Sequence, residues 1–483
     1  MNYRMISHVL GWVIGLEGVF MMLPFICALC YREENPFLFL FCGLLCIVVG
    51  LPLCLLKPKQ KSMFAKEGFV IVALSWILLS IFGALPFFIS RCIPSFVDAL
   101  FETASGFTTT GASILSDVEV LPKSLLFWRS FTHWIGGMGV IVFLVALLPL
   151  SGGDNMHLIR AESPGHSVGK LVPHVKSTAK ILYTIYLGLT LLQVTLMLLG
   201  GLDLFTALTL TFGTAGTGGF SVLNSSIATY SPYIQWVITI FMLIFGVDFA
   251  FYYFIIQRRF KNAFHLEEVR GYLGIVVTAI LLISLNIYPV LSALGTTTVA
   301  DTIRYSAFQV ASIITTTGYA TTDFNLWPQF AKMILVILMF MGACAGSTGG
   351  GIKVSRVMVL IKSIVKEVKV LVHPKSMVKV KLNGRPLEHE TLRGINVFCA
   401  SYIFIFAVIL LIVSLDNLDF TTNFTAVVAT LSNVGPGLGA VGPTGNFSCF
   451  SALSKLMLAM AMIIGRLEIF PVLVLLSPKT WNR

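Results

Sequence analysis

Charged residues are scarce in this sequence. Only 11% of its 483 residues are Asp, Glu, Lys or Arg, whereas 56% are apolar. Long apolar segments recur from end to end, and those at 68–89 and 127–150 reach the roughly 20 residues that cross a hydrocarbon core of about 30 Å. The run 6–30 lacks a signal-peptide cleavage site, so we interpret it as the first span. The sequence therefore predicts a polytopic membrane protein.

Clusters of metal-ligating or catalytic side chains are also missing. The nine cysteines are scattered, and the pairs Cys27/Cys30 and Cys42/Cys46 lack the His or further Cys partners of a zinc site. We interpret them as small buried apolar residues. An integral membrane enzyme would need His, Asp or Glu clustered at one membrane depth, and the sequence shows no such pattern. We therefore expect neither an enzyme nor a bound cofactor.

A glycine-rich stretch at 342–356, reading GACAGSTGGGIKVSR, lacks the register of a phosphate-binding loop. Its glycines have the required spacing, but Ile352 separates the last of them from Lys353. The segment before it reads as a helix, whereas a phosphate-binding loop follows a strand. Nucleotide binding is therefore not favoured, and the glycines need another explanation.

The excess of positive charge is concentrated in four loops. The formal net charge is +11, and in so apolar a chain this excess indicates membrane orientation rather than nucleic-acid binding. The positive-inside rule places the basic loops in the cytoplasm. Two spans precede the first loop and two lie in each of four later blocks, which predicts ten transmembrane helices with both termini cytoplasmic. The basic loops are 57–67, 151–180, 257–270 and 353–393.

Four segments rich in Thr and Gly fall on the outer side, one within each later block. Each begins with Asp, continues for 10–15 fairly apolar residues, and ends in a turn centred on Gly. The turn glycines Gly111, Gly219, Gly318 and Gly435 are 108, 99 and 117 residues apart, which indicates a fourfold internal repeat. The segments are 98–113, 203–221, 301–320 and 419–437. We expect a two-helix leader at 1–60 and repeats at 61–160, 161–262, 263–385 and 386–483.

An apolar helix too short to cross must re-enter from the side on which it began, with its irregular end buried in protein or lining water. The predicted fold is therefore an all-α integral membrane protein with ten transmembrane helices and four re-entrant pore helices. Its helix–pore-loop–helix repeats would surround one pore with fourfold pseudo-symmetry. The acids Asp98, Asp203, Asp301 and Asp419 are expected near the N-termini of the short helices, whose negative C-terminal ends would point inward and attract a cation.

Beyond each short helix, backbone carbonyls are expected to face the pore axis. Gly allows the positive φ that such a turn requires, and rings of carbonyls replace the water shell of a dehydrating ion. No ring of carboxylates occurs at these positions, which argues against a filter for divalent cations. The expected K⁺ ligands are Thr110, Gly111, Gly218, Gly219, Thr317, Gly318, Val434 and Gly435.

These motifs resemble the Trk/Ktr/HKT superfamily of potassium transporters, and most closely its bacterial Trk branch. The resemblance covers almost the whole chain and includes FTTTGAS, GTGGFS, ASIITTTGYATTDF, SNVGPGLG, GACAGSTGGGIK and GRLEIF. It implies potassium uptake across a bacterial inner membrane through a single-chain pseudo-tetrameric pore. It also implies a homodimer in the lipid membrane and a cytosolic TrkA-like regulatory subunit that binds NAD or ATP. Plant members with Ser at the first filter glycine transport sodium, so Gly111 points to potassium; Asp248 departs from the family pattern.

The glycine stretch interrupts the second span of the third repeat after about eleven apolar residues, or roughly 16 Å of helix. Non-helical backbone at that depth must lie against protein or a water-filled cavity. The stretch resembles the family's intramembrane loop, which obstructs the pore below the filter; a kink or close-packing site is the alternative. The expected gate residues are Gly346, Ser347, Thr348, Gly349, Gly350, Gly351 and Arg466.

Arg466 lies deep in the last span, where a guanidinium costs about 2.5–3.5 kcal/mol on insertion scales. It is expected either to delay cations below the filter and donate to carbonyls of the glycine stretch, or to form a structural ion pair with Glu468 or Asp248. Glu17 in the first span is expected to be a satisfied packing residue outside the pore, whereas Arg129 and His133 are expected to make interfacial or interhelical polar contacts.

Two mechanisms of potassium transport remain open from the residues alone, and a secondary carrier is the alternative of a different class. A channel and a sodium- or proton-coupled potassium symporter would use the same filter, so the sequence does not separate them. A secondary carrier for small solutes would show inverted repeats with broken helices at corresponding positions, and this pattern is not present. The loop 151–180 and the basic stretch 362–393 are either solvated faces or docking surfaces for the regulator.

Overall fold

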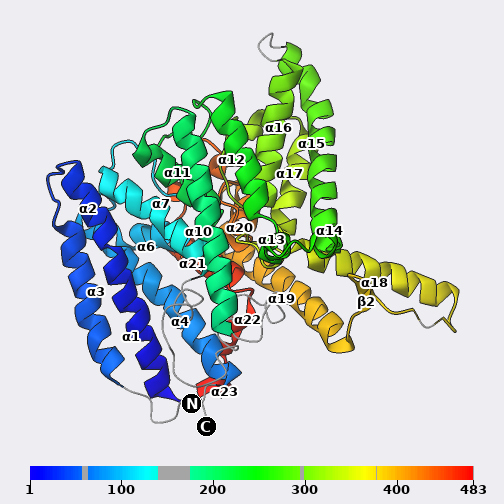
Figure 1. Cartoon of the computed structure of the whole chain (residues 1–483), viewed down its shortest axis with the longest axis horizontal. Helices are drawn as coiled ribbons and strands as arrows, with labels where there is room; N and C mark the ends of the chain where they lie inside the picture. The colour runs from blue at the N-terminus through cyan, green and yellow to red at the C-terminus, as the bar shows by residue number, and fades with distance from the viewer. Residues whose placement is uncertain (57–63, 140–174, 294–297, 377, 482–483) are drawn as a thin grey trace.

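The chain is built from helices, joined in the described residues by short turns and one small hairpin (Figure 1). The computed structural model describes residues 1–56, 64–139, 175–293, 298–376 and 378–481. The two termini meet, since the Tyr3 hydroxyl donates to the carbonyl of Trp481 at 3.4 Å. The expected boundary between residues 160 and 161 and most of the basic loops 57–67 and 151–180 lie outside the described residues.

A leader of three helices flanks the rest of the molecule (Figure 1). The first and third of these helices approach closely because Gly18 faces Gly43, where a Cβ would overlap the opposite backbone. The leader comprises α1 (Tyr3–Phe20), α2 (Met22–Cys30) and α3 (Leu38–Leu55). The adjoining α1 and α2 form one span, so the leader contributes two spans, as expected.

Four units follow the leader, each with a long helix, a short helix and a second long helix. The first has α4 (Ala65–Gly83), α5 (Leu85–Ile89), α6 (Phe96–Phe107) and α7 (Lys123–Met138). The second has α10 (Val175–Leu199), α11 (Leu204–Gly216), α12 (Pro232–Phe245), α13 (Phe249–Ile256) and α14 (Phe260–Phe264). The third has α15 (Glu267–Ala293), α16 (Val299–Ile314), η2 (Phe324–Leu326), α17 (Gln329–Met341) and α18 (Val354–Val372). The fourth has α19 (His389–Val413), η3 (Ser414–Asp416), α20 (Phe420–Leu431), η4 (Gly439–Val441), η5 (Phe447–Cys449), α21 (Ala452–Arg466), α22 (Phe470–Leu476) and α23 (Pro478–Trp481).

The long helices account for the ten expected spans. Six are long and apolar enough to cross a membrane, and the bent pairs α12–α13 and α21–α22 raise the number to eight. The other two spans are α7, which ends before the undescribed residues 140–174, and α17, which ends at the glycine stretch. The predicted all-α membrane fold with four re-entrant helices is confirmed.

The short helices α6, α11, α16 and α20 have 12, 13, 16 and 12 residues. At 1.5 Å per residue each is about 18–24 Å long, which is less than the membrane core. Their first turns are capped as expected, because side chains accept hydrogen bonds from the free backbone N–H groups. Asp203 and Asp419 are themselves N-caps, whereas Asp98 and Asp301 stand three residues after the N-caps Ser95 and Thr298.

The second long helix is interrupted in every unit, and not only in the third, where the sequence predicted a break. In the first unit α7 ends before Gly139, which has a φ of 82°. The pair α12–α13 bends by 91° and the pair α21–α22 by 120°. Each of these helices runs for 13–16 residues from its start before it ends, so the four units resemble one another in this respect too.

A basic arm leaves the bundle after the glycine stretch. Figure 1 shows α18 projecting sideways beside α19. The strands β1 (Lys381–Leu382) and β2 (Arg385–Pro386) form an antiparallel hairpin between these two helices. The arm has a small apolar core of its own, made by Val359, Val380 and Ile395.

Candidate functional site

The loops that follow the four short helices share one backbone conformation. We call residues 108–111, 216–219, 315–318 and 432–435 the ring loops. Each ring loop has four residues and ends in Gly. Its second residue, which is never Gly, and its final Gly both have a positive φ. The φ values are 55° and 79° at Thr109 and Gly111, 56° and 78° at Thr217 and Gly219, 58° and 85° at Thr316 and Gly318, and 57° and 102° at Asn433 and Gly435. The fourfold repeat is therefore present in the backbone itself.

Sequence reasoning identified the glycines but missed the residue two positions earlier. A positive φ is unusual for a β-branched residue, and such strain persists only where the surroundings impose it. The hydroxyls of Thr217 and Thr316 donate to the preceding carbonyls at 2.6 and 2.7 Å, which offsets part of the strain. The sequence signal that could have identified this residue is a Thr or Asn at the second position of all four ring loops.

The ring loops close on one another in sequence order. A Cβ added to Gly111 would fall within 3.0 Å of the carbonyl oxygen of Gly218, and the same holds at each later junction. The fourth junction returns to the first unit. The facing pairs are Gly111 with Gly218, Gly219 with Thr317, Gly318 with Val434, and Gly435 with Thr110. These eight residues, which we call the ring, are the eight that the sequence selected as ion ligands, and the structure brings all of them together.

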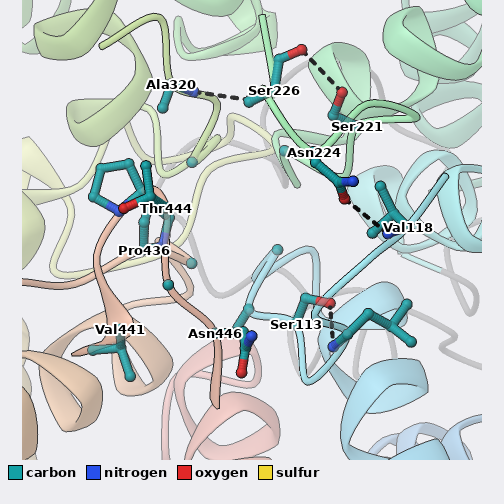
Figure 2. A pocket seen from close by; sticks show the side chains of 18 of the residues that line it. Ser113, Val118, Ser221, Asn224, Ser226, Ala320, Pro436, Val441, Thr444 and Asn446 are labelled. Atoms are coloured by element: carbon teal, nitrogen blue, oxygen red, sulfur yellow. Dashed lines mark hydrogen bonds between the residues drawn. The ribbon is translucent and has the colours of Figure 1, made fainter. Parts of the chain in front are cut away.

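The ring borders a cavity of about 170 Å³, whose other lining residues come mostly from the segments that follow the ring loops. Figure 2 shows its wall, where the Asn224 side chain accepts from the amide of Val118 at 2.8 Å and Ser226 accepts from Ala320 at 3.1 Å. The final glycine of each of the four ring loops lines it, and so does Arg129. Among the described residues that line the cavity there is no Asp or Glu.

A buried ion pair binds the segments that directly follow the first and second ring loops. The guanidinium of Arg129 on α7 lies 2.6 Å from the carboxylate of Glu102 on α6, and both side chains are almost fully buried. Arg129 also donates to the carbonyl of Ser221, just beyond the second ring loop, at 3.0 Å. Glu102 accepts from Ser113 and from the amide of Ile114 at 3.0 Å, just beyond the first ring loop. The expected interhelical role of Arg129 is confirmed, whereas Glu102 was missed.

His133 and Asn433 tie neighbouring units together. The imidazole of His133 is 2.7 Å from the carbonyl of Gly106 on α6, and its other nitrogen accepts from the amide of Phe220 at 3.3 Å. The Asn433 amide donates to the Thr110 hydroxyl at 2.9 Å and so joins the fourth unit to the first. The ring is thus cross-linked by side chains that approach from outside it.

The glycine stretch, Gly342–Gly351, lies against the inner side of the ring loops. The amide of Gly350 donates to the Thr316 hydroxyl at 2.6 Å, and a Cβ at Gly350 would overlap the carbonyl of Ser432. A Cβ at Gly349 would lie 3.0 Å from the carbonyl oxygen of Thr315. The stretch therefore contacts the third and fourth ring loops directly, and larger residues would not fit.

The glycine stretch is also held by the interruptions of the other units. The amide of Phe249 donates to Gly346 at 3.1 Å, and the amide of Cys344 donates to Gly246 at 3.1 Å. Asp248 is the N-cap of α13, where its side chain accepts from Ala250 at 2.9 Å. This unexpected acid therefore stabilises the start of a half-helix that follows the break.

Arg466 bridges the glycine stretch to the first unit. Its guanidinium donates to the carbonyl of Thr348 at 2.6 Å, and to the carbonyls of Gly136 and, at 2.8 Å, Gly137. Glu468, one of the expected ion-pair partners, pairs instead with Arg356. Glu17 is buried on α1 with its carboxylate facing Gly83, and among the described residues its oxygens have no hydrogen-bond partner, so the expectation of a satisfied packing residue is wrong. Arg466, which was selected from the sequence, does reach the glycine stretch.

Comparisons with known proteins agree with this architecture. A family model described as "TrkH: Cation transport protein" matches residues 37–483. The chain is 37% identical to the "Trk system potassium uptake protein TrkH" of Escherichia coli K12, and the match covers 100% of both chains. It is 32% identical to the "Trk system potassium uptake protein TrkG" of the same strain, over 100% of this chain and 99% of that one. The crystal structure of the potassium transporter TrkH from Vibrio parahaemolyticus superposes with a TM-score of 0.89 at 34% identity, covering 100% of each chain.

Proposed function

The chain belongs to the TrkH family of cation transport proteins, and we propose that it takes up potassium across a bacterial inner membrane. Membership in this family makes it a transporter and not an enzyme. The observation that carries the potassium assignment is the closed ring of four glycine turns, which sits where four short helices end. The relatives named as potassium uptake proteins support the same cation.

We propose that the ring is the selectivity filter. The carbonyl oxygens of Thr110, Gly218, Thr317 and Val434, with those of the adjoining glycines, would replace the water around a dehydrated K⁺ ion. The negative C-terminal ends of the short helices add to the attraction. The cavity above the ring lacks carboxylates among its described lining residues, and this favours a monovalent over a divalent cation.

We propose that the glycine stretch and Arg466 form the gate. The stretch contacts the ring loops from the inner side, and small residues make few apolar contacts, so a modest difference in partner affinity can displace it. The proposed assembly is a homodimer with a cytosolic TrkA-like subunit that binds NAD or ATP. Its support is that relatives are named as parts of a Trk system and that a basic arm extends from the gate.

The proposed orientation places the basic arm and both termini in the cytoplasm and the ring cavity on the outer side. We also propose that the chain divides into a leader, 1–60, and four repeats that end at residues 160, 262, 385 and 483. The repeated order of long, short and long helix supports this division.

Flux measurements in proteoliposomes test the function. The purified chain is reconstituted, and potassium, sodium and proton gradients are set independently. Potassium flux that greatly exceeds sodium flux and follows the potassium gradient alone is the expected result for a channel-like pore. Potassium accumulation that requires a sodium or proton gradient would support the symport alternative. Equal potassium and sodium fluxes would contradict the proposed filter.

A further inference from the structure

A buried lysine lies at the end of the glycine stretch. Lys353 is the N-cap residue of α18 and is only 7% exposed. Its ammonium group donates to the carbonyl oxygens of Gly349 and, at 3.4 Å, Gly350. An ammonium carries three donors and a full charge, so burial is costly unless acceptors surround it. In this position the acceptors are backbone carbonyls of the glycine stretch.

Gly350 is held from both sides. Its amide donates to the hydroxyl of Thr316 at 2.6 Å, and its carbonyl accepts from Lys353. Thr316 is the ring-loop residue of the third unit with a φ of 58°. One continuous path of hydrogen bonds therefore runs from the ring loop through the glycine stretch to the lysine, and displacement of the stretch must break it.

The charges around Lys353 disfavour a further cation. The groups that act electrostatically on it are the acids Glu468 and Glu268 and the cations Arg466 and Arg356. Asp248 also acts on the stretch, at Cys344, so that with Lys353 itself three formal positive charges and three carboxylates surround it. Two of these acids are engaged elsewhere, because Glu468 pairs with Arg356 and Glu268 accepts from the amides of Ala345 in the stretch at 2.6 Å and of Ser355 in the first turn of α18 at 3.0 Å. A cation that leaves the ring inward therefore meets the ammonium of Lys353 and the guanidinium of Arg466, both bound to carbonyls of the stretch, in a setting of low dielectric constant.

We propose that Lys353 is an internal cation that keeps the pore closed. Its ammonium takes up carbonyl oxygens just inside the ring, repels the departing ion, and holds Gly350 against Thr316. Opening requires the glycine stretch to leave both the ammonium and the threonine hydroxyl. This inference rests on the proposed potassium pore and adds Lys353 and Thr316 to the gate residues selected from the sequence.

The test measures potassium flux in proteoliposomes without any regulator. Lys353→Met keeps most of the side-chain stem but removes the charge and the donors, and Thr316→Val removes the hydroxyl but keeps the β-branched shape. Each is expected to raise flux roughly tenfold, the change that corresponds to losing one hydrogen bond with a charged or strained partner. The control is Lys362→Met on the same helix α18, because the ammonium of Lys362 binds Glu267 at the start of α15 and the carbonyl of Lys381 in the arm, and neither belongs to the ring or the glycine stretch.

Four outcomes are decisive. Faster flux in Lys353→Met, with the parent's potassium-to-sodium ratio and with Lys362→Met unchanged, supports the proposal. Flux equal to or below that of the parent overturns it. If Lys353→Met does not elute as a single species in detergent, the flux of Thr316→Val decides the question, because this variant leaves the buried charge in place. A Thr316→Val flux that is no higher than that of the parent overturns the proposal. A parent protein that shows no potassium selectivity would instead contradict the proposed function.

Discussion

At the residue scale, the ring depends on glycine for two separate reasons. Gly111 has a φ of 79°, which other residues adopt only with strain, and a Cβ there would fall within 3.0 Å of the Gly218 carbonyl oxygen. The sequence predicted the first requirement, because a turn after a short helix commonly needs a positive φ. It did not predict the second, which arises only when four distant loops meet.

These two requirements can be separated by substitution. Gly111→Ser is expected to lower the potassium-to-sodium flux ratio by fivefold or more, since backbone strain of about 1–3 kcal/mol falls on one quarter of the ring. Gly201→Ser is the matched control, because Gly201 has a φ of 87° but no atom within 4 Å of an added Cβ. Paired proteoliposome fluxes of the two ions provide the measurement. An unchanged ratio in Gly111→Ser would show that Gly111 is not part of the filter.

The Glu102–Arg129 pair is expected to matter for stability as well as for the ring. Its two side chains are 0% and 5% exposed, and removing one partner of such a pair leaves a buried charge at a cost of about 3–5 kcal/mol. Glu102→Gln should therefore lower the thermal unfolding temperature in detergent clearly. Asp98→Asn is the control, because the partly exposed Lys455–Asp98 pair should contribute only about 0–1 kcal/mol. Equal shifts in the two variants would contradict this account.

Arg466 provides both a charge and a cross-link, and two variants distinguish them. Arg466→Ala removes both and should raise regulator-independent potassium flux by about tenfold, if folding is retained. Arg466→Lys keeps the charge but cannot reach Thr348, Gly136 and Gly137 with one planar group. Flux of Arg466→Lys near that of the parent would assign the barrier to charge, whereas flux near that of Arg466→Ala would assign it to the cross-link. Unaltered flux in both well-folded variants would remove Arg466 from the gate.

At the element scale, the sequence predicted features that depend on local signals. The four short helices, their acidic N-terminal turns and the break after Met341 each follow from length, a capping residue or a run of glycines. The breaks after Met138, Phe245 and Arg466 were not predicted. Glycine is frequent in membrane helices, so the one to three glycines near each of these breaks carry little information without the neighbouring unit.

The contacts of the glycine stretch were also beyond sequence reasoning, because they join elements from three units. Glu268 on α15 lies 77 residues before its partner in the stretch and Arg466 on α21 lies 118 residues after its partner, whereas Lys353 directly follows the stretch. The sequence selected Arg466 because an isolated cation in a span is rare. It did not select Lys353, since a lysine at the edge of a basic arm looks like an ordinary cytoplasmic residue.

Shortening the glycine stretch tests the gate as an element. Deleting Gly346 to Gly349 removes the Thr348 carbonyl that binds Arg466 and the Gly349 carbonyl that binds Lys353. The ring loops remain, so we expect potassium selectivity to persist while regulator-independent flux rises by at least the roughly tenfold expected for a single lost contact. Flux and the ion ratio in proteoliposomes provide the measurement. A selective variant that conducts no faster than the parent would make the stretch a packing element.

At the scale of the whole molecule, four copies of one unit close a ring that no single unit can form. Each junction places a carbonyl of one loop against the glycine of the previous one, and the fourth junction returns to the first unit. The cavity is lined by the last residues of the ring loops and the segments after them, whereas the glycine stretch, from which the basic arm continues, contacts the first residues of two ring loops. The orientation of the chain in the membrane then decides which end receives the ion.

Cysteine labelling tests that orientation directly. Cys449 is exposed and follows Phe447, a residue that lines the ring cavity, whereas Lys375 is exposed in the turn after α18 on the basic arm. In a chain whose other cysteines are replaced by alanine, Cys449 should react with a membrane-impermeant maleimide in intact cells, because the positive-inside rule places the arm in the cytoplasm. With Cys449 also replaced, a Lys375→Cys variant should react only after the membrane is permeabilised. The reverse labelling pattern would place the ring cavity in the cytoplasm and the basic arm outside. Potassium entering the cell would then have to pass the gate before it reached the filter.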